Sequence, residues 1–388
     1  MEQNQHSLEY FSISEGGPFN KAIQKIGLNT NAKQIVVALC ITWLPLLIIT
    51  AIEGTIYSGV SVPFLKDVSI HVRLLIVLPM LLTIKAIINS KSIDLEIYFS
   101  NTLMNDKEKQ IVLNKELQRV KNLINSAVPE IIFLLIIIAI TISPLRGGIL
   151  HETTSWRVAV EGGDTVLSFA GKWVTFISIP IFQFLILRWL WRYIIWSLFL
   201  FRLSNTRLNL QLTHPDQVAG LGIVADVHKY FGLIFLAVNV IASGEMIVRI
   251  TENPDSFQAI RGEAIGNIAI CVVLIFLPLF FFIFKLIKTR HHALMDLGNL
   301  GAALSGKFEE EWLRNIPIEK KVLERKVSTS TLQDYSSVYR STEKMRTVPF
   351  RLQDVITVIL ILLIPYIPIL IIHFSIIELL QKLSGLLF

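Results

Sequence analysis

The chain has 388 residues, of which 53% are hydrophobic and only 17% are charged. Its mean hydropathy of +0.58 lies far above that of soluble domains and predicts a polytopic membrane protein. The net charge is +6, but the basic residues collect at the ends of apolar segments, where membrane topology accounts for them, so no nucleic-acid binding is predicted. Cys40 and Cys271 lie inside apolar segments without partner spacing, which argues against a disulfide framework and a zinc site.

The apolar segments predict an all-α bundle of about seven transmembrane helices. Residues 1–33 form a polar, cytosolic lead-in, and the apolar run after it is too long to belong to a cleavable signal peptide. The predicted spans are residues 34–52, 70–88, 129–142, 173–203, 230–248, 266–287 and 355–372. Residues 34–388 are therefore interpreted as one transmembrane domain, with cytosolic helical insertions at 89–127, 204–229 and 289–353.

The fourth span is longer than a membrane requires. From Trp173 to Leu203 only Pro180, near the start, interrupts the helical pattern, so we expect one helix of roughly 46 Å at 1.5 Å per residue. The hydrocarbon layer of a bilayer is about 30 Å thick. The membrane should therefore end near Arg192, and the apolar turns of residues 193–203 should project beyond the lipid and be covered by protein.

Amphipathic patterns fill the first and last insertions. Apolar residues recur at three- and four-residue spacing in 89–127, where Asn105 or Asp106 could cap the helix: Leu113, Leu117, Val120 and Ile124. A similar stripe runs through 289–353 until Pro317: Leu297, Leu300, Leu304, Phe308 and Trp312. A second helix is expected from Thr331, with Asp334 completing a capping box, to a point before Pro349. These helices either pack with residues 193–203 into one compact cytosolic layer or lie flat on the lipid surface.

The distribution of Lys and Arg sets the predicted orientation. The connection from Lys285 to Arg351 holds thirteen of them, whereas the four segments on the opposite side hold one, three, two and one. This bias places the N-terminus in the cytosol and the C-terminus outside. On the outer side, two alternating runs flank Glu161-Gly162-Gly163-Asp164 and predict an exposed β-hairpin.

Proline occurs inside five of the seven predicted spans, at Pro45, Pro79, Pro180, Pro278 and the pair Pro365 and Pro368. Each proline removes a backbone hydrogen bond and bends its helix. Neighbouring helices can re-satisfy the freed carbonyls, so ordinary membrane architecture explains the pattern. The functional alternative is a set of hinges or a pore-lining bend, and it is strongest at Tyr366 and Pro368 in the last span.

Five polar residues inside the spans are candidate pore or ligand residues. Arg188 and Arg192 share a face near the inner boundary, where they either snorkel to lipid phosphates or form an anion-attracting vestibule. Asn239 and Glu245 lie deeper in the fifth span, where a carboxylate is costly unless it faces protein or water. Arg249 follows Glu245 by four residues, so an ion pair within the helix is the alternative to a functional role.

The loop L-T-H-P-D-Q-V-A-G-L-G at 212–222 is the only stretch that resembles a chemical motif. His214, Pro215, Asp216, Gly220 and Gly222 suit a tight turn in which Asp216 caps the following helix. A metal site would require His228 and the pair at 291–292 to converge with them, which the spacing does not demand. No common catalytic or phosphate-binding signature occurs, so neither an enzyme nor a cofactor is predicted.

Three stretches carry a family resemblance: S-I-P-I-F-Q-F-L-I-L-R-W-L-W-R at 178–192, the loop at 212–222, and M-R-T-V-P-F at 345–350. They resemble a family of uncharacterised bacterial multi-pass membrane proteins over most of the chain. The resemblance implies a bacterial inner-membrane location and no particular activity. The arrangement of spans is also similar, in architecture alone, to the seven-span chemoreceptor channels of insects, with no shared residue motif.

Two functions remain open from the sequence. The first is a homo-oligomeric channel or transport protein, suggested by the kinked spans, Asn239, Glu245 and the cytosolic layer. The second is a membrane sensor or scaffold whose cytosolic layer binds a protein partner through the 212–222 loop. Many secondary transporters contain internal repeats, and none is evident here, which favours a channel or scaffold over a transporter.

Overall fold

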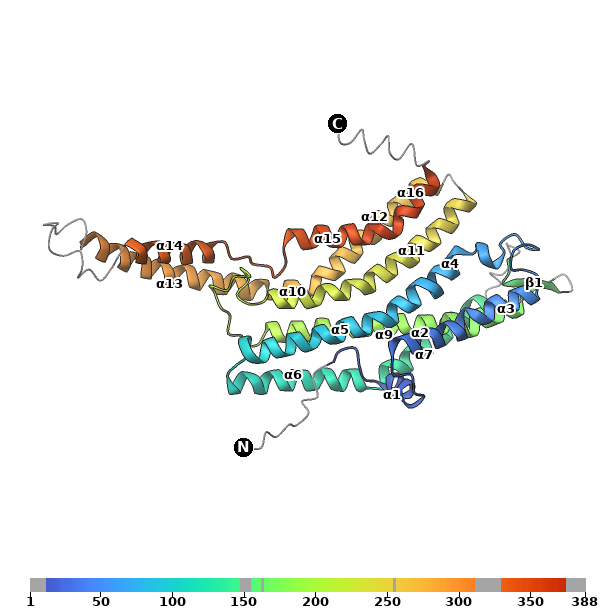
Figure 1. The fold of residues 1–388 in the computed structure, drawn as a ribbon, viewed down its shortest axis with the longest axis horizontal. Coiled ribbons are helices and arrows are strands. Elements are labelled where there is room, and N and C mark those ends of the chain that lie inside the picture. The colour runs from blue at the N-terminus through green and yellow to red at the C-terminus, as the bar shows by residue number, and fades with distance from the viewer. Residues whose placement is uncertain (1–11, 147–154, 162–163, 254–255, 311–328, 375–388) are drawn as a thin grey trace.

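The computed structural model describes residues 12–146, 155–161, 164–253, 256–310 and 329–374, which are almost entirely helical. Seven helices in this part of the chain are long and apolar enough to cross a membrane, which supports a multi-pass membrane protein. They run roughly parallel to the long axis of the molecule (Figure 1). Each contains one of the predicted spans: Asn31–Ile52, Val68–Leu103, Lys107–Ile142, Phe169–Ser204, Gly222–Glu252, Phe257–Glu309 and Leu352–His373.

The first half of the chain contains these elements: α1 (Pro18–Lys25), α2 (Asn31–Thr42), α3 (Leu44–Ile52), η1 (Phe64–Lys66), α4 (Val68–His71), η2 (Val72–Val77), α5 (Leu78–Tyr98), η3 (Phe99–Leu103), α6 (Lys107–Asn125), α7 (Val128–Arg146), β1 (Val158–Glu161), β2 (Asp164–Leu167), α8 (Phe169–Trp173), η4 (Val174–Ser178) and α9 (Ile179–Ser204). The second half contains α10 (Gly222–His228), η5 (Lys229–Phe231), α11 (Gly232–Glu252), α12 (Phe257–Phe276), η7 (Leu277–Phe282), α13 (Ile283–Glu309), α14 (Thr329–Glu343), α15 (Leu352–Leu363), η9 (Ile364–Tyr366) and α16 (Ile367–His373).

Several helices continue well past the predicted span ends. The second span extends without interruption to Leu103, so the first part of the predicted 89–127 insertion continues that helix. The sixth extends to Glu309 and takes up the start of the predicted 289–353 insertion in the same way. Sequence composition marks where a helix leaves the lipid, but it does not mark where the helix ends, because nothing in these stretches stops helical hydrogen bonding.

The prolines coincide with local departures from α-helical geometry. Pro45 follows a break at Trp43, and Pro278 lies within the 3₁₀ turn η7. Pro79 and Pro180 each follow a π-helical turn directly, η2 and η4. Pro365 lies within the 3₁₀ turn η9, which separates α15 from α16 in the last span. At each of these positions the regular α-helical hydrogen-bond ladder is interrupted, as expected beside a proline, which lacks an N–H group.

A helical layer continues the bundle beyond the predicted inner boundary. The four apolar residues predicted to line one face of α6 are all buried, which confirms that stripe: Leu113, Leu117, Val120 and Ile124. In the last turns of α9, Trp196 and Leu200 are fully buried, as predicted, while Ile194 and Phe201 on the opposite side are about half exposed. The N-cap position of α6 is Asp106, but its side chain makes no capping hydrogen bond and pairs with Lys109 instead.

The pair α13 and α14 extends away from this layer (Figure 1), so the predicted single compact layer is wrong for residues 289–353. The two helices pack on each other near Tyr335, whose hydroxyl donates to the Leu297 carbonyl at 2.6 Å. The Tyr335 ring lies beside Gly301, where a larger residue would leave no room for it. Leu300, which belongs to the predicted apolar stripe, is 50% exposed. Helix α14 begins at Thr329, so Thr331 lies inside it; Trp312 and Pro317 lie outside the described residues.

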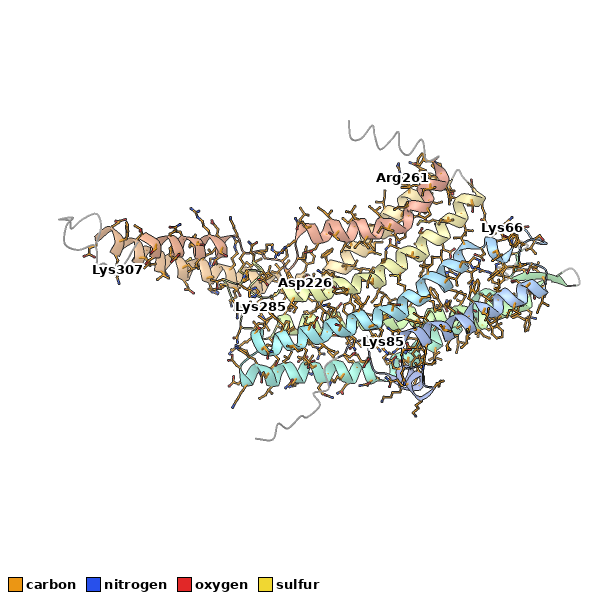
Figure 2. All side chains as sticks on the ribbon, in the orientation of Figure 1. Lys66, Lys85, Asp226, Arg261, Lys285 and Lys307 are labelled. Atoms are coloured by element: carbon orange, nitrogen blue, oxygen red, sulfur yellow. The ribbon has the colours of Figure 1, made fainter. Side chains whose placement is uncertain are left out.

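The two ends of the spans carry charged residues. Figure 2 shows Lys66 and Arg261 near one end of the bundle and Asp226 and Lys285 near the other. At the first end, β1 and β2 form the predicted hairpin, with Glu161 opposite Asp164. This end is held by buried Trp156, whose indole N–H donates to Asp67 at 3.0 Å.

Candidate functional site

The structure brings three polar residues together between the fifth, sixth and last spans. Asn239 of α11 is fully buried, and its side-chain oxygen accepts hydrogen bonds from the Tyr366 hydroxyl at 2.9 Å and the Asn267 amide at 3.2 Å. The Asn267 amide also donates to the Tyr366 oxygen at 2.8 Å, which closes a triangle of contacts. Asn239 and Tyr366 were predicted separately as candidate pore or ligand residues, and their contact is a finding of the structure.

The side-chain amide nitrogen of Asn239 is hydrogen-bonded as well. It donates to the Phe235 carbonyl at 2.8 Å and to the Cys271 sulfur at 3.2 Å. One turn further along α11, the Ser243 hydroxyl donates to the Pro365 carbonyl in the 3₁₀ turn of the last span. These contacts give the buried side chains of Asn239 and Ser243 protein partners, and they join the last span to the fifth and sixth spans at its 3₁₀ turn. Pro368, just after this 3₁₀ turn, is exposed.

The ion pair between Glu245 and Arg249, which was the alternative to a functional role, does not form. Glu245 instead accepts hydrogen bonds from Ser69 and Arg73 of the second span. Arg249 forms a two-pronged ion pair with Glu263 of the sixth span. Each pair joins α11 to another helix. Glu245 and Arg249 therefore have closer partners on neighbouring helices than on their own helix.

The predicted snorkelling of Arg188 and Arg192 is also wrong. Arg192 is 5% exposed and donates to the carbonyls of Ile13 and Gly16, which belong to the lead-in segment. Arg188 lies 3.4 Å from Glu130 of α7. The same carboxylate accepts the backbone N–H of Phe19 at 3.0 Å, so the lead-in folds back onto the fourth span and covers both guanidinium groups.

The 212–222 loop forms the predicted tight turn, with a single carboxylate at its centre. Asp216 accepts backbone N–H groups from Val218 at 2.9 Å and Gly220 at 3.1 Å through Oδ1, and from Gly222, the first residue of α10, at 2.9 Å through Oδ2. Burial raises the pKa of this carboxyl group, but the backbone hydrogen bonds outweigh it and hold the pKa below its usual value. His214 lies against the same carboxylate at 2.9 Å.

Two glycines allow this compact shape. Gly220 has a φ of +88° and lies close to the Tyr98 hydroxyl, and a Cβ atom on Gly222 would approach the Asp216 side chain to 3.0 Å. Pro215 occupies the exposed tip of a turn closed by the Gln217 N–H and the His214 carbonyl, 3.1 Å apart. Gln217 itself has a φ of +58°, which is uncommon for a residue other than glycine, so the carboxylate holds a strained backbone.

This loop binds the segment that leads into the last span. The Arg346 guanidinium donates to the Asp216 carbonyl at 2.7 Å, and its backbone N–H donates to the Gln217 carbonyl at 2.8 Å. Adjacent Met345 is 3% exposed. Two of the stretches noted in the sequence, 212–222 and 345–350, are therefore two sides of one contact, which we call the loop clamp.

The imidazole groups do not converge on a metal. His228 is buried beside Trp196, far from the clamp contacts of His214, and the pair at 291–292 lies exposed on α13. Among the described residues, no group of three or more His, Cys, Asp or Glu side chains could hold a metal ion.

Sequence reasoning missed four partners: Arg73, Glu263, Asn267 and Arg346. Asn267 was detectable, because it is an amide inside an apolar span like Asn239, whereas the others lie near span ends, where charged residues need no special explanation. Comparisons with models of protein families, with curated proteins and with solved structures find no match. The resemblance to a bacterial membrane-protein family therefore stays a prediction.

Proposed function

We propose that the protein is a homo-oligomeric ion channel of the bacterial inner membrane, with the N-terminus in the cytosol and the last span beside the pore. The main support for this proposal is the way in which the last span is attached to the bundle. One face of α15, η9 and α16 is fastened to the bundle through Tyr366 and the buried residues Leu362 and Ile369. The opposite face is uncovered, with Leu360, Ile364 and Ile367 between 49% and 59% exposed.

A path between copies fits the placement of polar groups better than a path through one copy. Asn239, Glu245 and Arg249 each contact protein partners, so they mark no open polar route within the bundle. The uncovered face of the last span has polar Gln353 and Thr357 at its inner end and apolar side chains further along. Apolar constrictions of this kind gate by expelling water from the pore.

The flux assay uses purified protein in liposomes. We expect ion flux from wild type and a larger flux from Ile364→Thr, because a hydroxyl group wets an apolar constriction. Ile138→Thr on α7, which is 53% exposed, is the matched control and should behave as wild type. A monomer in lipid nanodiscs, or liposomes without flux under any ionic condition, would remove the channel proposal.

Orientation is tested separately. A reporter fused after Phe388 should be active only on the outer side of the membrane, because Lys and Arg crowd the connections on the other side. Cytosolic reporter activity would contradict the proposed orientation.

A membrane sensor or scaffold remains the second candidate, and the protruding α13–α14 pair favours it. The clamp loop is covered by residues 345–346 of the same chain, so a cytosolic protein partner would bind the pair instead. Met295 and Leu300 on α13 are 58% and 50% exposed. Absence of flux together with a defined complex lost in Leu300→Asp would support this candidate.

A further inference from the structure

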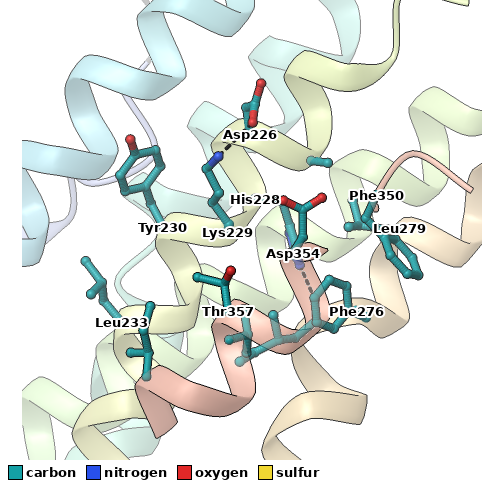
Figure 3. Close-up of a pocket in the computed structure, with 14 residues that line it drawn as sticks. Asp226, His228, Lys229, Tyr230, Leu233, Phe276, Leu279, Phe350, Asp354 and Thr357 are labelled. Carbon is teal, nitrogen blue, oxygen red and sulfur yellow. Dashed lines mark hydrogen bonds and ion pairs between the residues drawn. The ribbon is translucent and has the colours of Figure 1, made fainter. Parts of the chain in front are cut away.

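A cavity of about 320 Å³ lies where the start of the fifth span, the end of α12 and the start of the last span meet (Figure 3). Its size is at the lower end of the range of small-molecule sites in proteins. Helix α15 forms one wall, and Phe350, the last residue of the 345–350 stretch, closes one side against Phe276. The cavity contains no residue of the Asn239 cluster, and it shares only Thr357 with the uncovered face of the last span described above.

The lining has a polar part and an apolar part. Lys229 and Asp226 form an ion pair at 2.7 Å, and Asp354 and Thr357 of α15 line the cavity with them. Apolar side chains from three helices line the rest: Leu233, Leu279, Phe276, Val358 and Ile361. Thr357 and Ile361 are both exposed, so the cavity can be reached from outside the bundle.

His228, at the back of the cavity, contributes no charge. Its Nδ1 accepts the indole N–H of Trp196 at 2.8 Å, and its Nε2 is hydrogen-bonded to the Ile275 carbonyl. A ring nitrogen that accepts carries no proton, so the single proton is on Nε2 and the ring is neutral.

The charged groups of the lining leave one carboxylate in excess. Lys229 balances Asp226, whereas Asp354 accepts only the Arg351 backbone N–H at 2.7 Å and forms no ion pair within the described part of the chain. Arg346 keeps its positive charge and attracts Asp354 electrostatically, but it does not line the cavity and forms no ion pair with Asp354. The aromatic rings of Tyr230, Phe276 and Phe350 add faces that attract cations.

We propose that this cavity binds a small amphiphile with one positively charged amine or quaternary ammonium head and an apolar tail. The head would lie at Asp354, and the tail would lie along Leu279 and Val358. Charge complementarity selects a cation, because an anionic or neutral head leaves the excess carboxylate without a partner. Binding at this site does not depend on whether the protein conducts ions.

Hexyltrimethylammonium is a suitable probe, with hexanesulfonate as its anionic counterpart of equal chain length. Binding is measured as a concentration-dependent rise in melting temperature in a neutral detergent, because a ligand that binds only the folded state stabilises it. The cation should raise the melting temperature of wild type, and the anion should not. Equal effects of both probes, or no effect of the cation, would overturn the proposal.

Variants locate the site. Asp354→Asn keeps an oxygen for the Arg351 N–H and removes the charge, and it should weaken binding of the cation by about tenfold. Asp296→Asn, an exposed carboxylate on α13 that does not line the cavity, is the matched control and should bind as wild type. Val358→Trp should abolish binding by filling the cavity. If Asp354→Asn binds the cation as well as the control does, the assigned site is wrong.

Discussion

Replacement of Asp216 tests how the loop clamp is held. The side chain is 18% exposed and accepts three backbone N–H groups at 2.9 to 3.1 Å. Each donor that loses its partner costs about 1 kcal/mol at a site where water can partly replace it, so Asp216→Ala should lower the free energy of unfolding by about 3 kcal/mol. Asp216→Asn keeps one oxygen for Val218 and Gly220 and loses the contact with Gly222, so it should cost about 1 kcal/mol.

The assay is equilibrium or thermal unfolding of the purified protein in one detergent for all three forms. Amide hydrogen exchange at Val218, Gly220 and Gly222 locates the effect, with the first two protected in Asp216→Asn and exposed in Asp216→Ala. Equal costs for the two variants, or a cost below about 0.5 kcal/mol for Asp216→Ala, would refute the idea that these hydrogen bonds hold the loop.

The pKa of Asp216 fixes how the stability difference between wild type and Asp216→Asn should change with pH. The folded-state pKa of Asp216 lies below its usual value of 3.8, so its contribution to stability is present above that value. It is lost as the pH falls through the lower, folded-state pKa. The stability difference between wild type and Asp216→Asn should therefore be present above about pH 4 and shrink as the pH falls below it. A difference that grows on acidification would contradict the depressed pKa.

Two substitutions and one pair of double-mutant cycles test further contacts of the spans. Tyr366→Phe should cost about 1 kcal/mol, the usual size of an interhelical hydrogen bond in lipid, and an unchanged stability would mean that the Asn239 cluster is not closed. A double-mutant cycle between Glu245 and Arg73 should give a coupling of about 1 kcal/mol, whereas the cycle between Glu245 and Arg249 should give a smaller one; the reverse result would restore the pairing within the helix. Trp196→Asp should cost several kcal/mol because it buries an unpaired charge, and a wild-type melting temperature would show that these turns are not covered.

The sequence predicted the features that depend on local periodicity or backbone chemistry. The apolar stripe of α6 is visible because its period matches a helix turn, and the departures from α-geometry are visible because proline lacks an N–H group. The turn around Asp216 is visible for the same reason, since proline and glycine constrain the backbone directly.

The errors concern partners distant in the chain. Arg249 was considered as a partner of Glu245 because spacing along one helix can be read directly from a sequence. Its actual partner, Glu263, lies on another helix, so finding it requires knowing how the two helices pack. Arg192 is held by main-chain carbonyls, and every residue has a carbonyl, so no side-chain pattern marks its partner. The two halves of the loop clamp were each noticed as motifs, but their contact depends on the course of α13 and α14 between them.

The contact between Arg192 and the lead-in has a consequence for synthesis in the cell. Ile13 and Gly16 leave the ribosome long before Arg192, yet they supply the carbonyls that its guanidinium requires. The lead-in can contact Glu130 once the third span is in place, but its contacts with Arg192 can form only after the fourth span has been made. In a nascent chain arrested before Arg192 emerges, a protease on the side of the lead-in should cut residues 12–25 faster than in a chain arrested after the fourth span.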